Sequence, residues 1–338
     1  MYIEIKLQEN RIPAVDYLKG FSIFTIVMMH LIQRMTAVPN QIQVLAQIGG
    51  TGVHVFFVCS SIGLYLSYLK NKPSFFDFIK KRFSKIYFPY IIVVLISFFL
   101  PWMYSGKDRV VALLSHVFLF KMFVPRFDES FGPQLWFIST IIQLYLLFIP
   151  MCILKKKIKS NKLFFLLFFA ISIGWWVFCW AAGLSHERIW NSFCLQYIWE
   201  FSLGFIIAEL LLNKKAFKIN NILLIIIAVV GISLQAGMAL LLDSLKIFND
   251  IPALFGYGAL AILLMNISFV KRAASWLSSF SYELYLIHLL IFLTIWHFIK
   301  PETLLIQCLI GVVSMAIAFI VSCYYHKLIG IVSRKKKV

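Results

Sequence analysis

The sequence predicts an all-α polytopic membrane protein of about ten transmembrane helices, and three observations support this. The chain has 338 residues, of which 61% are hydrophobic and only 14% are charged, too few polar side chains to cover a soluble domain of this size. Apolar runs of about 20 residues, the length that crosses a bilayer, recur from end to end. The Lys and Arg residues behind the net charge of +18 lie mainly in short loops between these runs. This pattern is typical of membrane topology, so nucleic acid is not expected as a partner.

Ten runs are predicted as spans, and the distribution of basic residues orients them. The runs are 14–34, 48–69, 86–102, 133–154, 163–182, 192–212, 222–242, 251–269, 282–299 and 304–325. Of the 32 Lys and Arg residues, 23 fall on the side that carries both termini and 8 on the other side, with Lys19 inside the first run. The positive-inside rule therefore predicts cytoplasmic termini in a multi-pass protein of the cell (cytoplasmic) membrane.

The chain is also predicted to form one domain over residues 1–338, because no internal repeat or low-complexity linker divides it. The longest outer loop, 103–132, contains an apolar stretch too short to span, which suits the membrane interface or a re-entrant segment. The six cysteines lie in or beside apolar runs without Cys-x-x-Cys spacing. They are interpreted as small buried hydrophobic residues, and no metal or bound cofactor is expected.

The first run contains four ionisable residues, which a simple membrane anchor does not need. At about 100° per residue, Asp16, Lys19, His30 and Arg34 fall within a sector about 60° wide. Lys19 and His30 lie about 16 Å apart along the axis of such a helix. A charge within a span costs about 2.5–3.5 kcal/mol on insertion scales, so this stripe is predicted to face the bundle interior. Anchoring at the interface explains Arg34 equally well, whereas His30 lies within the apolar run and is suited to exchange a proton.

Polar residues in later spans are candidates to line a cavity. Those that we single out are Trp136, Gln143, Glu200 and His288. Glu200 lies well inside its span, where a carboxylate is protonated, paired or functional. The small residues Gly204 and Ala208 on the same face favour close helix packing. His54, in the second run, is also assigned to packing because it follows the glycines of "GGTG".

Two basic residues stand at the cytoplasmic start of the third run, in "KKRFSKIYFPY". Arg82 and Lys85 are one helical turn apart and are the basic residues of this segment nearest the membrane. Positive-inside topology alone accounts for Lys80 and Lys81. Arg82 and Lys85 are therefore the better candidates to bind an anionic group that enters the bundle.

Five segments in this order resemble the integral-membrane acyltransferase-3 family. They are "AVDYLKGFSIFTIVMMH", "GVHVFFVCSS", "RFSKIYFPY", "LWFISTIIQLYLLF" and "SYELYLIH". Members of this family mostly O-acetylate surface polysaccharides or peptidoglycan. Its pattern of an arginine and a histidine separated by ten residues is matched by Lys19 and His30. Its pattern of two arginines three apart is matched by Arg82 and Lys85. Both substitutions by lysine keep the charge but lose the bidentate geometry of a guanidinium.

The resemblance implies transfer of an acyl group, acetyl in most relatives, from acyl-CoA to a hydroxyl. The acceptor is a surface polysaccharide or its lipid-linked precursor. Arg82, Lys85 and Lys19 would bind the CoA phosphates, and Asp16 would orient Lys19. His30 would act as general base or pass on the proton from an acyl intermediate.

Two other classes of function remain open from the residues alone. A transporter or flippase for a glycan or lipid-linked sugar also needs buried charges and a polar cavity. The absence of an internal repeat of the kind that many transporters show argues against it. A structural subunit of a glycan-assembly complex would leave the aligned charges of the first run unexplained.

Overall fold

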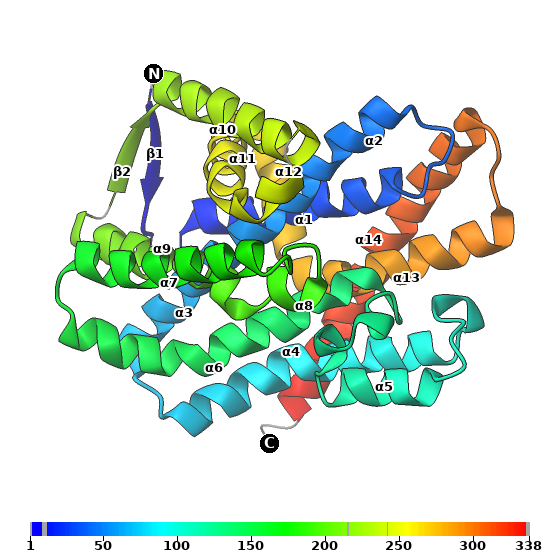
Figure 1. The fold of residues 1–338 in the computed structure, drawn as a ribbon, viewed down its shortest axis with the longest axis horizontal. Helices are drawn as coiled ribbons and strands as arrows, with labels where there is room; N and C mark the ends of the chain where they lie inside the picture. Colours follow the sequence, from blue (N-terminus) through cyan, green and yellow to red (C-terminus); the bar gives the residue numbers. More distant parts are fainter. Residues whose placement is uncertain (1, 9–11, 215, 242, 336–338) are drawn as a thin grey trace. The chain divides into compact units, whose positions relative to one another are not determined.

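The computed structural model describes residues 2–8, 12–214, 216–241 and 243–335 (Figure 1). Helices dominate this part of the chain and the only strands in it form one short pair, which confirms the all-α class. Eight helical segments among these residues are long and apolar enough to cross a membrane, as expected for a polytopic membrane protein. They are Pro13–Ile32, Asn40–Asn71, Pro133–Lys157, Asn161–Ala181, Arg188–Lys214, Asn221–Ala239, Ser281–Ile299 and Leu304–Val332.

The chain packs into two compact units, each assembled from three separate stretches. Unit 1 comprises Met1–Ser22, Thr51–Lys80 and Thr140–Ser279, and unit 2 comprises Ile23–Gly50, Lys81–Ser139 and Phe280–Val338. The single domain predicted over residues 1–338 stays a prediction, because packing alone does not define a folding unit.

Unit 1 contains a two-stranded sheet and most of the helices. Its complete elements are β1 (Tyr2–Lys6), α3 (Gly52–Asn71), α7 (Asn161–Ala181), α8 (Arg188–Asn191), α9 (Cys194–Lys214), β2 (Ala216–Asn220), α10 (Asn221–Leu241), α11 (Asp250–Leu264) and α12 (Ser268–Ser278). The first part of α1 (Pro13–Ile32), the start of α4 (Phe75–Phe98) and most of α6 (Trp136–Lys157) also belong to it. A 3₁₀ turn over Asp243–Phe248 joins α10 to α11.

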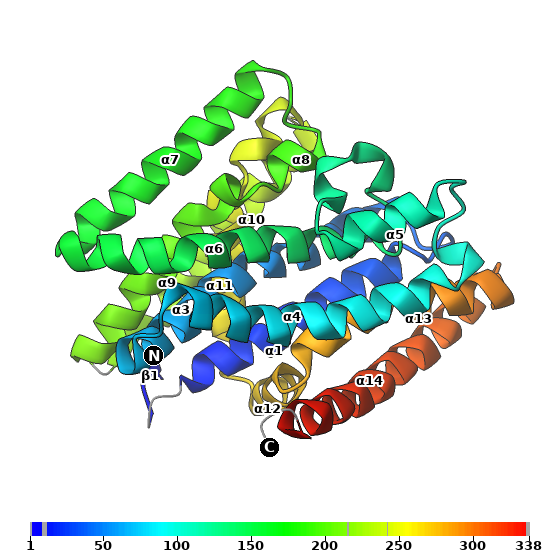
Figure 2. The same cartoon turned by 90° about the horizontal axis from the view of Figure 1, so that it is seen from below.

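Unit 2 contains the remaining helices and several short turns. Its complete helices are α2 (Asn40–Ala46), α5 (Arg109–Val117), α13 (Ser281–Ile299) and α14 (Leu304–Lys335). Helices α13 and α14 pack side by side in both views (Figures 1 and 2). The 3₁₀ turns are Gln47–Thr51, Pro101–Met103, Lys121–Phe123, Pro125–Phe127 and Pro133–Leu135.

The eighth predicted span, 251–269, is wrong as a single straight helix. Helix α11 ends at Leu264, and α12 begins at Ser268 after a bend of 116°. A helix of 15 residues is about 22 Å long, which is less than the hydrocarbon thickness of about 30 Å. The two helices together therefore form at most one further, broken span. The apolar run continues across the bend, so periodicity did not reveal it.

Close packing of α3 against α9 confirms the prediction made from the small residues of the sixth span. A Cβ atom on Gly204 would lie 2.7 Å from the carbonyl oxygen of Val58. Ser61 lies beside Gly204 and donates a hydrogen bond to the carbonyl oxygen of Phe201. Glycine is therefore required at position 204, because it lets the two backbones approach.

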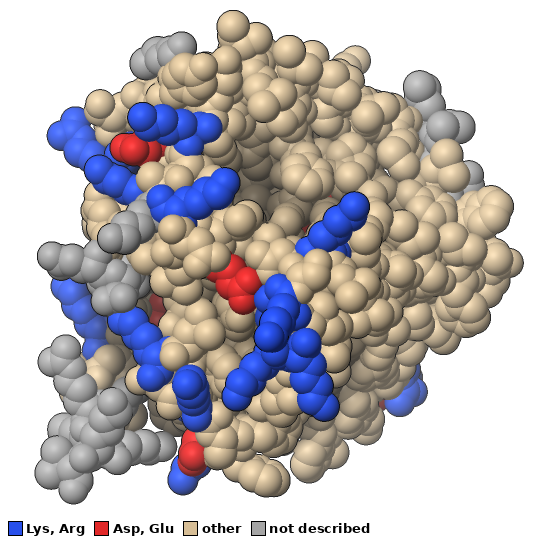
Figure 3. Space-filling model, turned by 90° about the vertical axis from the view of Figure 1, so that its left-hand side faces the viewer, with Lys and Arg blue, Asp and Glu red and all other residues tan. Residues whose placement is uncertain are grey.

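The antiparallel pairing of β1 with β2 was not predicted, because residues 213–218 ("NKKAFK") lie between two predicted spans and were taken as a basic loop. The register pairs Tyr2 with Asn220 and Lys6 with Ala216. Ile3 anchors the sheet, since its buried side chain belongs to a cluster with Leu224 of α10 and Ala259 of α11. Basic side chains gather on the face drawn in Figure 3, as expected where short basic loops join apolar helices.

The segment predicted as the longest outer loop is held by a buried histidine. Nδ1 of His116, on α5, accepts a hydrogen bond from the Tyr90 hydroxyl at 2.7 Å. Its Nε2 donates to the carbonyl oxygen of Ser130 at 3.1 Å. Lys121 is buried as well, and its Nζ donates to the carbonyl oxygen of Gly132 at 2.8 Å. Burial, reinforced by the nearby Lys121 ammonium, lowers the pKa of His116 well below its usual range.

We expect His116 to destabilise the fold in acid. Because the folded state keeps this imidazole neutral, the unfolded chain binds the extra proton, and stability falls as the pH drops below about 6.5. The contribution approaches about 1.4 kcal/mol per pH unit. Melting temperatures in detergent between pH 7.5 and 5 should therefore depend less on pH in His116→Gln than in wild type. His186→Gln, at an exposed site, is the control. Equal pH dependence in wild type and His116→Gln would contradict this account.

Candidate functional site

The residue with the strongest signal in the sequence, His30, meets a second histidine in unit 2. Nδ1 of His30, near the end of α1, lies 2.9 Å from Nε2 of His288 on α13. The two rings stack with their centroids 5.0 Å apart. His288 is fully buried, whereas His30 is partly exposed. The structure thus brings together two predicted site residues that are 258 positions apart.

The hydrogen bonds fix how the protons are arranged in this pair. Nδ1 of His288 lies 2.8 Å from the carbonyl oxygen of Leu284, which only accepts. In neutral His288 the proton is therefore on Nδ1, and Nε2 accepts a hydrogen bond from Nδ1 of His30. Neutral His30 then carries its lone pair on Nε2, the tautomer that a general base needs.

The start of α6 is tied to α13 one turn before His288. The Tyr285 hydroxyl donates a hydrogen bond to the backbone carbonyl oxygen of Gln134. The side-chain Oε1 of Gln134 is buried and has no hydrogen-bond partner among the described residues. The predicted cavity residue Trp136 follows as the first residue of α6 and is partly buried. These contacts hold the 133–136 segment near the histidine pair within unit 2.

Arg34 was predicted within the first span but lies in the turn after α1, two residues beyond its last residue, Ile32. Its backbone amide donates to the carbonyl oxygen of Leu31 at 2.9 Å. Its Nε is buried without a hydrogen-bond partner among the described residues. Arg34 therefore keeps one buried N–H donor that no described residue satisfies.

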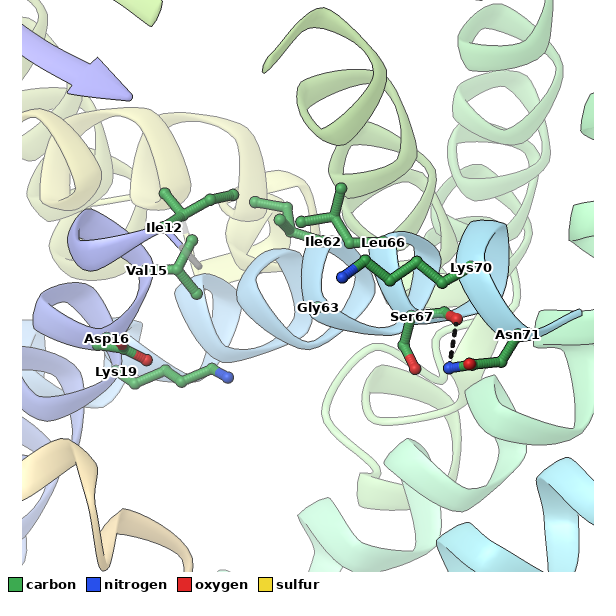
Figure 4. A pocket seen from close by; sticks show the side chains of 10 residues that line it. All are labelled: Ile12, Val15, Asp16, Lys19, Ile62, Gly63, Leu66, Ser67, Lys70 and Asn71. Carbon is green, nitrogen blue, oxygen red and sulfur yellow. Dashed lines mark hydrogen bonds between the residues drawn. The ribbon is translucent and has the colours of Figure 1, made fainter. Parts of the chain in front are cut away.

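Lys19 and Asp16 line a pocket of about 300 Å³ in unit 1 (Figure 4). The pocket lies between α1 and α3, and its other polar residues are Ser67, Lys70 and Asn71. Figure 4 shows the ammonium groups of Lys19 and Lys70 pointing into the same space. Two cationic side chains that converge on one pocket favour binding of an anion. Lys70, in the last turn of α3, was not singled out in the sequence, because it follows the second predicted span in a basic segment that topology alone explains.

Arg82 and Lys85 lie on α4, in unit 2, as predicted from the start of the third apolar run. Both are engaged in contacts with other residues of the protein. Their assignment to donor binding stays a prediction.

The two remaining candidates, Gln143 and Glu200, lie in unit 1 and hold helices together. Gln143 accepts a hydrogen bond from the backbone amide of Cys194 at 3.3 Å, which joins α6 to α9. Glu200 is fully buried, and its Oε1 lies 2.6 Å from Nδ1 of His54. His54 therefore pairs with Glu200 in addition to packing between helices. The sequence did not predict this pair, because nothing in it indicates that α3 faces α9 at this point.

Comparison with known protein families identifies the family of this chain. A family model described as an acyltransferase domain, of the acyltransferase-3 type, matches residues 12–323. The chain belongs to the acyltransferase-3 family. No curated protein and no solved structure matched it. The family match confirms the resemblance noted from the five segments, and with the apolar helices it makes the chain a membrane acyltransferase.

Proposed function

We propose that this acyltransferase transfers an acyl group, acetyl first among the candidates, from cytoplasmic acyl-CoA to a hydroxyl group. The acceptor is a surface polysaccharide or its lipid-linked precursor, and the enzyme resides in the cell membrane. The observation that carries the proposal is the chain of hydrogen bonds from Leu284 through His288 to His30, which presents the Nε2 lone pair of His30.

The proposed reaction uses that lone pair as a base. Nε2 of His30 accepts the proton of the acceptor hydroxyl while the hydroxyl oxygen attacks the thioester carbonyl. The new C–O bond forms, the C–S bond breaks, and the CoA thiolate takes the proton back from His30. His288 positions the imidazole and stabilises its protonated form by accepting from Nδ1. Arg34, with its free Nε, is proposed to bind the acceptor.

The donor is proposed to bind through its phosphates. The Lys19 and Lys70 ammonium groups converge on a pocket that suits a phosphate group or another part of CoA, with Asp16 placed to orient Lys19. Arg82 and Lys85 are retained as further donor-binding candidates. Trp136, Gln143 and Glu200 remain second-rank candidates for the acceptor.

The direct test is consumption of labelled acetyl-CoA by the purified protein in liposomes supplied with a glycan or lipid-linked glycan acceptor. We expect label to leave CoA and appear on the acceptor as an ester. Saturable binding of acyl-CoA separates this function from that of a flippase. If the protein neither binds nor consumes acetyl-CoA or longer acyl-CoA donors, the proposed donor is wrong, and glycan flipping becomes the next assay.

The donor pocket has its own prediction. Lys19→Met and Lys70→Met should each raise the KM for acyl-CoA about 5- to 10-fold, since each removes one cation that faces a phosphate. The rise should shrink at high salt because these groups are partly exposed. Lys156→Met, which removes an exposed basic residue at the end of α6, is the matched control. An unchanged KM in both pocket variants would place the donor elsewhere without overturning the transferase.

A further inference from the structure

A second group of ionisable side chains lies in unit 1, where three helices meet. His54 of α3 stands between two carboxylates: its Nδ1 is 2.6 Å from Oε1 of Glu200 on α9, and its Nε2 is 3.9 Å from Oδ1 of Asp250 on α11. Glu200 is fully buried, and the side chains of His54 and Asp250 are only 14% and 12% exposed. One nitrogen or oxygen atom from each of the three residues lies within 4.8 Å of the others.

The acceptor atoms around this cluster exceed the donors. Oε2 of Glu200 is buried without a hydrogen-bond partner among the described residues. Gln196, also on α9, donates from Nε2 to Oδ2 of Asp250 at 2.7 Å, but its buried Oε1 has no partner there either. Even a fully protonated imidazole has two N–H groups, which point toward Glu200 and Asp250. At least two buried oxygen atoms therefore still lack a donor or a cation.

The charges are unbalanced as well. In the described part of the chain, the only ion pairs of Glu200 and Asp250 are those with His54. Two carboxylates and one imidazolium leave a net negative charge in a buried site, which is costly unless one carboxyl group takes up a proton or a further cation binds. A divalent ion bound with a neutral imidazole would balance the charge of the two carboxylates.

We propose that His54, Glu200 and Asp250 bind one divalent transition-metal ion of the Zn²⁺ type. One imidazole nitrogen with two carboxylate oxygens is a ligand set that such ions accept. Ligand atoms about 2.0 Å from a tetrahedral ion lie about 3.3 Å from one another. The 2.6 Å contact between His54 and Glu200 opens by less than 1 Å to reach that spacing. The other ligand atoms, which lie within 4.8 Å of one another, move closer by at most about 1.5 Å.

The site joins α3, α9 and the first residue of α11, so the ion would stabilise unit 1. It departs from the expectation of no metal that followed from the cysteines, which take no part in it. The proposal does not depend on the acyl-transfer reaction, because its evidence and its test concern unit 1 alone.

Metal analysis of the full-length protein tests the site. Protein purified in detergent without chelator, then equilibrated with Zn²⁺ and freed of excess, should hold about one ion per chain. Removal of the ion by chelation should lower the melting temperature, and Zn²⁺ should restore it. Replacement by Co²⁺ should give the visible absorption of a nitrogen- and oxygen-ligated ion. If wild type retains less than a tenth of an ion per chain and its melting temperature does not change when Zn²⁺ is added or removed, the proposal is overturned.

Variants locate the ion. Glu200→Gln, Asp250→Asn and His54→Asn should each reduce the bound metal from about one ion to below a tenth per chain. Glu283→Gln is the matched control, because Glu283 also contacts a histidine, His326, at 3.0 Å but forms no three-residue ligand group with other described residues. This control should keep its ion. If all three cluster variants still hold about one ion per chain, the ion binds elsewhere and the assignment is overturned. The Co²⁺ spectrum of wild type decides the matter if the variants do not fold.

Discussion

Replacement of His30 by glutamine is expected to lower kcat for acyl transfer by about 10²- to 10⁴-fold, the usual contribution of a general base. Glutamine has a similar length and keeps a hydrogen-bonding side chain near His288, so the fold should be retained. It has no lone pair that takes up a proton near neutral pH. Single-turnover transfer from labelled acetyl-CoA in liposomes measures the loss, with donor binding measured in parallel. Donor binding should change little, because His30 acts on the acceptor proton.

His288 supplies the control that separates chemistry from folding. His288→Gln removes the acceptor for Nδ1 of His30 but leaves the His30 imidazole, so its kcat should fall less than that of His30→Gln. Its pH–rate profile should shift, because the charge state and tautomer of His30 are no longer set by its partner. Normal turnover by a folded His30→Gln protein would remove His30 from the mechanism. Equal losses in both variants with unchanged pH profiles would reduce the pair to a structural role.

The sequence predicted most helices well because each is encoded locally. The third predicted span, 86–102, is not confirmed, because α4 is not among the described helices long and apolar enough to cross a membrane. The predicted runs 14–34, 163–182 and 222–242 correspond to Pro13–Ile32, Asn161–Ala181 and Asn221–Leu241. The length of an apolar run and the polar residues that flank it are properties of one segment. A window of about 20 residues therefore detects them directly. The bend after Leu264 escaped this approach, because no glycine or proline marks it and the polar Asn266 and Ser268 are isolated within an otherwise apolar run.

The sequence does not indicate which helices contact one another, and the candidate site depends on these contacts. Periodicity placed His30 on a polar stripe, but its partner His288 is fixed by how α13 packs against α1. Asp250 was missed for a related reason. It stands one residue before the predicted eighth span and was read as part of a loop, whereas the structure makes it the first residue of α11. A single sequence holds no signal that pairs Asp250 with His54.

The tightest helix crossing of unit 1 predicts the largest loss of stability. A Cβ atom on Gly20 of α1 would lie 1.6 Å from the carbonyl oxygen of Ala274 on α12 and 2.5 Å from its carbon. Both atoms belong to the backbone, so no side-chain rotation relieves the clash, and α12 would have to move away from α1. Gly20→Ala should therefore cost about 3 kcal/mol or more and reduce the yield of monodisperse protein.

Gly174→Ala on α7 is the matched control, since nothing lies within 4 Å of the added methyl group. Alanine also favours the helix there by about 1 kcal/mol, so this variant should melt at or slightly above the wild-type temperature. Thermal melting and size-exclusion profiles in one detergent compare the two substitutions. If Gly20→Ala melts at the same temperature as wild type, α12 does not pack on α1 as described. A large loss at position 20 alone would show that α12, which follows the bend after α11, packs on α1 only because position 20 has no side chain.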